Sequence, residues 1–140
     1  YHGNVDQQTL AAEMKSSAVW LYPANFIESF CITAIEAMCA GCYPLVREIG
    51  ALKDTLRPFV DRGMATLFYH EPYSREDQRA WAEKLKEVLE ARSWEKIDMN
   101  GFDYSWSGVA QDFIKLGSLK ADEPLRVPNH TVTRSIEARM

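Results

Sequence analysis

Short apolar runs alternate with helix-like segments along this chain, and this alternation limits the possible folds more than any other feature. Three runs read as strands, namely AVWLYP at 18–23, PLVRE at 44–48 and MATLFY at 64–69. The clearest helical pattern lies at 75–92, where one face carries Trp81, Leu85, Val88 and Leu89. Strands that alternate with helices form βαβ units. The sequence therefore predicts an α/β fold with a Rossmann-like parallel sheet and flanking helices.

The predicted sheet is partial. A doubly wound sheet usually has about five or six strands, whereas only the three runs above are convincing. We therefore expect the missing strands to belong to an upstream part of the protein or to a partner, and the start at Tyr1 agrees with an excised piece. We predict one domain over 1–117 and an extension or linker over 118–140, where apolar density falls and two prolines appear.

Capping residues set the expected helix boundaries. Asp6 can cap a first helix whose inward face carries Leu10 and Met14. The strand at 18–23 is apolar throughout, which predicts burial on both of its faces. A last helix is expected to begin at Ser105 or Ser107.

Composition excludes several classes of partner. The formal net charge of −4 argues against nucleic acid or an anionic membrane, because both call for a basic surface. No apolar run approaches the roughly 18 to 20 residues of a membrane span, and no signal peptide is visible. The chain has three cysteines, Cys31, Cys39 and Cys42, all in one apolar segment, which does not fit a disulfide framework or a zinc site. We expect reduced thiols in a cytoplasmic protein, and no metal site.

The central segment NFIESFCITAIEAMCAGCYPL keeps two carboxylates among apolar residues. A helix over 29–40 would be apolar almost all round, with Ser29, Thr33 and Glu36 in one narrow polar stripe. A buried Glu36 would need hydrogen-bond partners. An internal arginine or backbone amides could supply them, and so could a ligand with adjacent hydroxyls such as a ribose. The residues alone leave both explanations open.

Glu28 stands just before this predicted helix. Ligands of open parallel sheets bind at the carboxyl ends of the strands. There the backbone N–H groups of Ser29, Phe30 and Cys31 would form an anion site suited to phosphate, and Glu28 could hold the hydroxyls of an attached sugar. The plainer alternative is an ordinary acidic residue at a helix N-terminus. Arg47 and Lys53 could meet a phosphate, although solvated surface charge is the favoured interpretation for both.

The segment ESFCITAIEAMCAG at 28–41 resembles the E-x7-E segment, typically EGFGxxxxEAMAxG, of retaining family 4 glycosyltransferases with the two-domain GT-B fold. The resemblance extends over nearly all of 2–117, through HGNVDQQTLAAEMKSSAVWLYPANF, IGALKDTL and DYSWSGVAQDF. It implies that the chain is the C-terminal half of a GT-B donor domain. The chain departs from the family pattern where glycines are usual, at Ser29, Cys31 and Ala51.

The resemblance also implies roles for individual residues. Glu36 would bind the ribose of a UDP- or GDP-linked sugar, and Glu28 would contact the donor hexose as the catalytic-site carboxylate. The backbone around Phe30 and Cys31 would hold the diphosphate or the sugar, while Ser29 and Thr33 would line the donor pocket. Transfer would retain the anomeric configuration without a metal ion or a separate cofactor.

The implied partners lie mostly outside this chain. The resemblance implies an N-terminal domain that binds an unknown acceptor, which could be a glycan, a lipid or a protein. The chain alone is therefore expected to bind donor weakly and to be inactive, and peripheral membrane attachment of the full-length enzyme stays open. The alternative is a non-catalytic Rossmann-like binding or scaffolding module. A dehydrogenase is disfavoured because no G-x-G-x-x-G follows a strand.

Overall fold

A computed structural model describes residues 2–105, 107–108, 110–111 and 114. The chain divides into two compact units, Tyr1–Met99 and Asn100–Met140, and each is considered by itself. The predicted extension at 118–140 lies outside the described residues. The domain boundary that we predict at 117 therefore stays a prediction.

The first unit is built on a parallel sheet. Its three strands, β1 (Val19–Tyr22), β2 (Tyr43–Arg47) and β3 (Thr66–Phe68), lie in the order β1-β2-β3. Both pairs are parallel, with Leu45 opposite Leu21 on one side and opposite Thr66 on the other. The sequence prediction of an α/β unit with a parallel sheet is confirmed.

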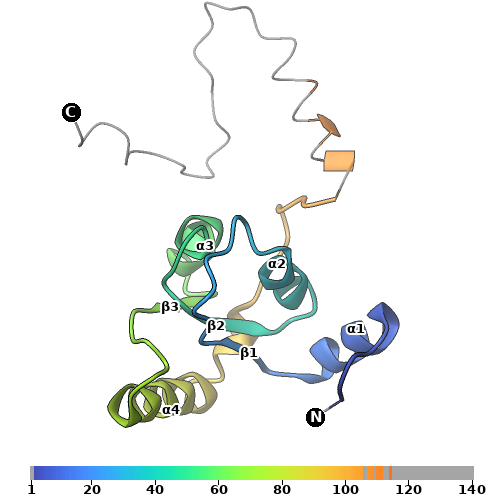
Figure 1. The fold of residues 1–140 in the computed structure, drawn as a ribbon. Coiled ribbons are helices and arrows are strands. Elements are labelled where there is room, and N and C mark those ends of the chain that lie inside the picture. The colour runs from blue at the N-terminus through green and yellow to red at the C-terminus, as the bar shows by residue number, and fades with distance from the viewer. Residues whose placement is uncertain (1, 106, 109, 112–113, 115–140) are drawn as a thin grey trace, which may run out of the picture. The chain divides into compact units, whose positions relative to one another are not determined.

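Four α-helices accompany the strands. They are α1 (Gln7–Ser16), α2 (Ile32–Cys39), α3 (Leu52–Val60) and α4 (Arg75–Glu90), and a short 3₁₀ helix, η1 (Ser93–Lys96), follows α4. Helices α2 and α3 cover one face of the sheet and α4 covers the other (Figure 1). This is the layered arrangement expected for part of a Rossmann-like domain.

Helix α4 closes the core on its face of the sheet. Trp81 and Val88 are buried against Tyr43 and Leu45 of the central strand. The indole Nε1 of Trp81 also donates to the carbonyl of His70 at 3.0 Å, so its one polar atom is satisfied. The predicted apolar face is confirmed at these two positions. It is wrong at Leu89, which is 43% exposed because it lies at the rim of the α4 contact.

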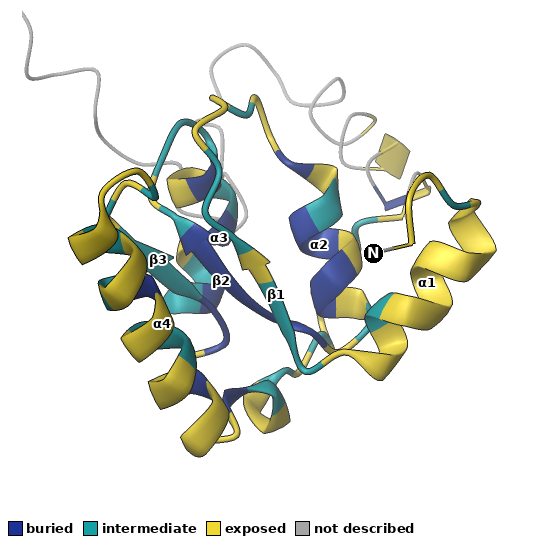
Figure 2. Ribbon diagram, turned by 60° about the horizontal axis from the view of Figure 1, so that its bottom comes forward, coloured by how far each residue is buried: buried dark blue, intermediate teal, exposed yellow. Residues whose placement is uncertain are grey.

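Helix α1 has the predicted cap but not the predicted buried face. The Asp6 carboxylate accepts from the backbone N–H of Thr9 at 2.7 Å, as expected of an N-cap. No residue of α1 is buried (Figure 2). Leu10, which we expected to point inward, is 41% exposed. The reason is that no strand of the described part of the chain lies beneath this helix.

Strand β1 is also more exposed than its sequence suggests. We predicted burial on both faces, but Leu21 is 42% exposed. In the described sheet β1 has only β2 as a hydrogen-bonded neighbour, whereas β2 has two, and the central strand is the one that is buried. An apolar run therefore does not by itself distinguish a central strand from an edge strand.

The described residues of the second unit include the predicted last helix. Residues 107–108, 110–111 and 114 are helical. The hydroxyl of Ser105 accepts from the backbone N–H of Gly108 at 3.0 Å, which is the contact of an N-terminal cap.

Across the described residues of the chain, no helix has both the length and the apolar character to cross a membrane.

Candidate functional site

The candidate site lies where the three parallel strands end. Their carboxyl ends continue into the loops 23–31, 48–51 and 69–74. Because parallel strands end at the same edge of a sheet, these loops share the edge at which open α/β sheets bind ligands.

Helix α2 begins later than the sequence predicts. We expected its first turn at Ser29, but Cys31 has left-handed backbone angles (φ 67°, ψ 71°) and α2 begins at Ile32. A left-handed residue other than glycine costs about 1–2 kcal/mol and cannot continue a right-handed helix. The amides of Ser29, Phe30 and Cys31 therefore belong to the loop and not to the first helical turn. Their predicted contact with a diphosphate stays a prediction.

The loop that carries Glu28 is anchored through three of its backbone carbonyls. The N–H of Ala51 donates to the carbonyl of Glu28 at 3.0 Å. The Thr55 hydroxyl donates to the carbonyl of Phe30 at 2.7 Å, and the Arg47 guanidinium donates to that of Ala24 at 3.5 Å. These donors come from the end of β2 and from the start of α3. The fold itself thus determines the path of the loop.

The Glu28 side chain is held as well. The hydroxyl of Tyr22, the last residue of β1, donates to Glu28 Oε1 at 2.8 Å. The Tyr22 ring stacks on Trp20, with centroids 4.7 Å apart and planes 15° from parallel. The hydrogen bond to Glu28, followed by burial and the charge of Glu28, raises the pKa of Tyr22 to about 12. The phenol is therefore protonated at neutral pH.

Gly50 allows the loop to approach α3 closely. Its φ is +55°, and a Cβ atom built on it would lie 3.0 Å from the carbonyl oxygen of Glu28 and 2.9 Å from a methyl carbon of Ile27. Only glycine combines this backbone conformation with so little space. Gly50 is thus a steric condition for the observed position of Glu28.

Glu36 is in a different environment from the one we predicted. The sequence suggested a buried carboxylate, but Glu36 is exposed on α2. It lines a hollow of about 430 Å³ between α1 and α2, together with Gln7, Leu10, Ala11, Met14, Lys15, Cys39 and Ala40. Among the described residues, none forms a hydrogen bond or an ion pair with the Glu36 carboxylate. The prediction of burial is wrong, and a cavity remains beside the carboxylate.

Helix α2 is buried on one side and not all round. Its inner side is formed by Ala34, Ile35, Ala37 and Met38. Its outer side carries Ile32, Glu36 and Cys39, all of them exposed. The predicted polar stripe is therefore only partly realised. Of the predicted site residues, Cys31 is buried, Glu28 and Thr33 are half-buried, and Ser29, Phe30 and Glu36 are exposed.

The three cysteine thiols have raised pKa values. All three are free, and the Cys42 thiol donates to the Met14 carbonyl at 2.9 Å. Burial raises the pKa of Cys31, Cys39 and Cys42, and the charge of Glu36 adds to the shift at Cys39. Cys39 and Cys42 have the C-x-x-C spacing of redox pairs, but a redox pair needs a lowered thiol pKa, and both of these pKa values are raised.

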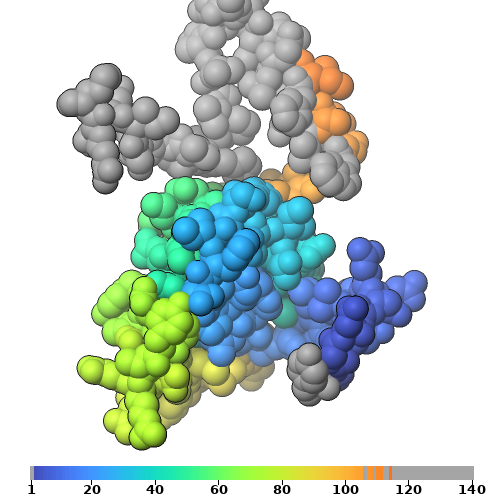
Figure 3. All heavy atoms as spheres, in the orientation of Figure 1, coloured from blue at the N-terminus to red at the C-terminus, as the bar shows by residue number. Residues whose placement is uncertain are grey.

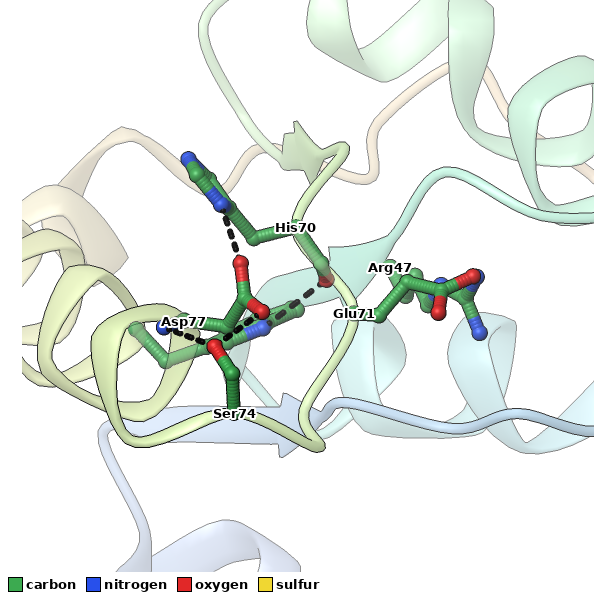
Figure 4. Close-up of polar contacts among 6 residues, drawn as sticks. Arg47, His70, Glu71, Ser74 and Asp77 are labelled. Carbon is green, nitrogen blue, oxygen red and sulfur yellow. Dashed lines mark hydrogen bonds and ion pairs between the residues drawn. The ribbon is translucent and has the colours of Figure 1, made fainter.

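Polar contacts at this edge involve the end of β2, the loop 69–74 and the first turn of α4 (Figure 4). Arg47, which we expected to be solvated, has a side chain only 12% exposed and forms an ion pair with Glu71. His70 Nδ1 lies 2.6 Å from an Asp77 oxygen, and Ser74 caps α4 through the N–H of Asp77. The hydrogen bonds from Ser74 and then His70 lower the pKa of Asp77. These contacts fix the start of α4 at the carboxyl edge.

Sequence reasoning missed Tyr22, Arg47 and Thr55 as residues that hold the site. Arg47 and Thr55 contact residues 23 to 25 positions away, at separations set only by the folded chain. Tyr22 gave one weak signal, since a tyrosine that ends a strand before Pro23 places a hydroxyl at the ligand-binding edge.

The chain is similar to known proteins over most of its length. The family model "Glycosyl transferases group 1" matches residues 1–100. The chain is 32% identical over 110 residues to a glycogen synthase of Desulfitobacterium hafniense, which is 74% of this chain and 23% of that protein. It is 30% identical over 102 residues to a glycogen synthase of Lachnospira eligens, which is 69% of this chain and 21% of that protein.

The matched region thus spans between a fifth and a quarter of the length of these two relatives. No solved structure matches the chain significantly. The family match covers well over half of the chain. The chain therefore belongs to the group 1 glycosyl transferases, which are of the GT-B type.

Proposed function

We propose that this chain forms part of the donor-binding half of a glycosyltransferase that uses a nucleotide-diphosphate sugar. The donor would be UDP- or GDP-linked, and the transferred group a hexose. The observation that carries the proposal is the Glu36 carboxylate, which lines a hollow of about 430 Å³ without a hydrogen-bond or ion-pair partner among the described residues. That volume is in the range of small-molecule sites, about 300–1,000 Å³.

The chemistry of a ribose fits Glu36. A carboxylate has two oxygens that accept hydrogen bonds, and the 2′ and 3′ hydroxyls of a ribose are adjacent donors. Each hydrogen bond to a charged group contributes about 1.5–3 kcal/mol. Exposure in the free chain supports this assignment, because a carboxylate already engaged with an internal cation could not accept from a diol.

Glu28 would contact the donor hexose from the neighbouring loop. In the proposed reaction the bond between the anomeric carbon and the diphosphate breaks, and a bond to an acceptor oxygen forms with retained configuration. The diphosphate leaves with the bonding electrons and takes up the proton that the acceptor hydroxyl releases. We propose that positive charge and backbone dipoles near the loop 23–31 stabilise the leaving group without a metal ion. Glu28 would orient the sugar by accepting from its hydroxyls.

The relatives suggest the kind of acceptor. Both are named glycogen synthase, so we propose a glycan acceptor ahead of a lipid or a protein. Acceptor binding would belong to a part of the enzyme beyond the matched region. A cytoplasmic location is likewise a proposal.

Nucleotide binding tests the proposal. Ligand-observed NMR detects millimolar binding, so we would titrate UDP and GDP into the unaltered chain, the Glu36→Gln chain and the Glu83→Gln chain. Glu83 is exposed on α4, on the opposite face of the sheet from α2, and serves as the matched control. We expect saturable binding of one nucleotide, weakened at least about tenfold, or 1.4 kcal/mol, by Glu36→Gln alone. Absence of binding to the unaltered chain, or equal binding by all three, would favour a scaffolding module.

A further inference from the structure

We propose that Tyr22 is a positioning residue that holds one oxygen of Glu28, so that the other oxygen faces the sugar of the donor. This inference rests on the proposed function, since it assigns Glu28 to the sugar. It adds a residue outside the E-x7-E segment to the donor site, and it predicts how sugar recognition can be lost without loss of nucleotide binding.

The geometry assigns separate tasks to the two Glu28 oxygens. Oε1 accepts from the Tyr22 hydroxyl at 2.8 Å. An ionised carboxylate has about four lone-pair sites on its two oxygens. One phenol hydrogen bond therefore fixes the orientation of the carboxylate and leaves acceptor capacity for hydroxyl groups.

Tyr22 is a rigid support for this contact. It is the last residue of β1, and its ring is stacked on Trp20 at 4.7 Å. The Glu28 backbone is fixed independently, because its carbonyl accepts from the N–H of Ala51 at 3.0 Å and Gly50 packs against it. The backbone and the side chain of Glu28 are thus both held before any ligand arrives. Such preorganisation removes the ordering cost that a free side chain would have on binding.

The chemical nature of Tyr22 is suited to this task. An arginine or lysine at this place would neutralise Glu28 and compete with the hydroxyl groups of a sugar. A phenol orients the carboxylate while leaving its charge in place. The pKa of Tyr22 is raised from 10.0 to about 12, so the phenol stays a donor even at a pH where an ordinary tyrosine begins to ionise.

The test compares a nucleoside diphosphate with the matching nucleotide sugar. Tyr22→Phe removes the hydroxyl and keeps the ring that stacks on Trp20. Tyr43→Phe is the matched control, because Tyr43 begins β2 at the opposite edge of the sheet and its hydroxyl also makes one hydrogen bond, with the Thr66 hydroxyl at 3.0 Å. Affinities of the full chain for UDP or GDP and for the corresponding hexose conjugate would be measured by ligand-observed NMR, with thermal unfolding as a check on folding.

We expect the unaltered chain and Tyr43→Phe to bind the sugar conjugate more tightly than the bare diphosphate. Tyr22→Phe should lose about fivefold or more of that difference while its affinity for the bare diphosphate changes less than about twofold. In a Glu28→Gln background, Tyr22→Phe should add little, because the two residues act through one contact.

Three results would overturn the inference. A parallel loss of affinity for both ligands would give Tyr22 a purely structural role. Unchanged affinities in Tyr22→Phe, with Glu28→Gln still losing the sugar-dependent part, would show that Glu28 needs no support. Failure of the unaltered chain to bind any nucleotide would overturn the proposed function and this inference with it, and it is distinguishable because it precedes every substitution.

Discussion

Glu28 and Glu36 lie in regions of opposite character. Glu28 is in a loop whose carbonyls are bonded to β2 and α3 and whose carboxylate is held by Tyr22. Glu36 faces a hollow that has α2 on one side and α1 on the other. Helix α2 buries four residues, whereas α1 buries none and stands out at the side of the unit (Figure 3). The loop around Glu28 is thus held in place by the fold, whereas the hollow beside Glu36 is well packed only on its α2 side.

The two sides of the proposed site differ in how far they are ordered before ligand binds. The sugar side is ordered by contacts within the described unit, so binding there requires little rearrangement. The nucleotide side includes α1, which buries no residue and is tied to the residue before β2 by the hydrogen bond from the Cys42 thiol to the Met14 carbonyl. Ligand binding is therefore expected to order α1 more than the loop around Glu28.

The largest expected effect compares the loss of unfolding free energy at a buried residue of α2 with that at an exposed residue of α1. Met38 of α2 is fully buried, and Met38→Ala should lower the free energy of unfolding by about 2–5 kcal/mol because it leaves a cavity. Leu10→Ala in α1 should change it by less than about 0.5 kcal/mol, as is usual for exposed positions. Urea unfolding followed by circular dichroism measures both. Comparable losses in the two variants would contradict the contrast between α1 and α2.

A smaller effect is expected at the glycine beneath Glu28. Gly50→Ala combines a positive φ with close contacts to Ile27 and Glu28, so we expect a loss of about 2–3 kcal/mol, above the roughly 1–2 kcal/mol of left-handed strain alone. Gly63→Ala is the control, because Gly63 has φ +70° but no atom within 4 Å of the position that its Cβ would take. Equal urea midpoints for the two variants would mean that the loop 23–31 can shift away from residue 50 without a loss of stability.

Titration of Tyr22 gives the smallest effect and examines the Glu28 contact alone. The pKa of Tyr22 is raised from 10.0 to about 12, chiefly by its hydrogen bond to Glu28. A raised pKa stabilises the fold below the unfolded value, and this stabilisation is lost as the pH rises from about 10 through 12. Glu28→Gln should move the Tyr22 pKa back toward 10, as measured by NMR of ring-labelled tyrosine. An unmoved pKa would mean that the 2.8 Å contact is absent in solution.

Sequence reasoning predicted the elements well where local pattern decides them. The strand at 44–48 and the helix from Arg75 are visible as an apolar run and a periodic face, and both are present. Asp6 is identifiable as a cap because that role depends on neighbours three residues away. These features need no knowledge of distant parts of the chain.

The errors arose where a distant part of the chain decides the outcome. Apolar residues surround Glu36 in the sequence, but its exposure depends on how closely α1 packs against α2. Helix α2 begins at Ile32 and not at the predicted Ser29, because Cys31 adopts a left-handed conformation. The sequence did not indicate this, since only glycine adopts that conformation readily. Arg47 forms an ion pair with Glu71, which lies 24 positions away in the sequence and meets it only in the folded chain.

Removal of the ribose diol from the ligand tests the central claim most directly. The unaltered chain and the Glu36→Gln chain would each be titrated with the preferred nucleoside diphosphate and with its 2′,3′-dideoxy analogue, by ligand-observed NMR. We predict that loss of the diol weakens binding to the unaltered chain at least about tenfold, or 1.4 kcal/mol, and leaves binding to Glu36→Gln nearly unchanged. An equal loss in both chains would contradict the account, since the diol would then be recognised by something other than Glu36.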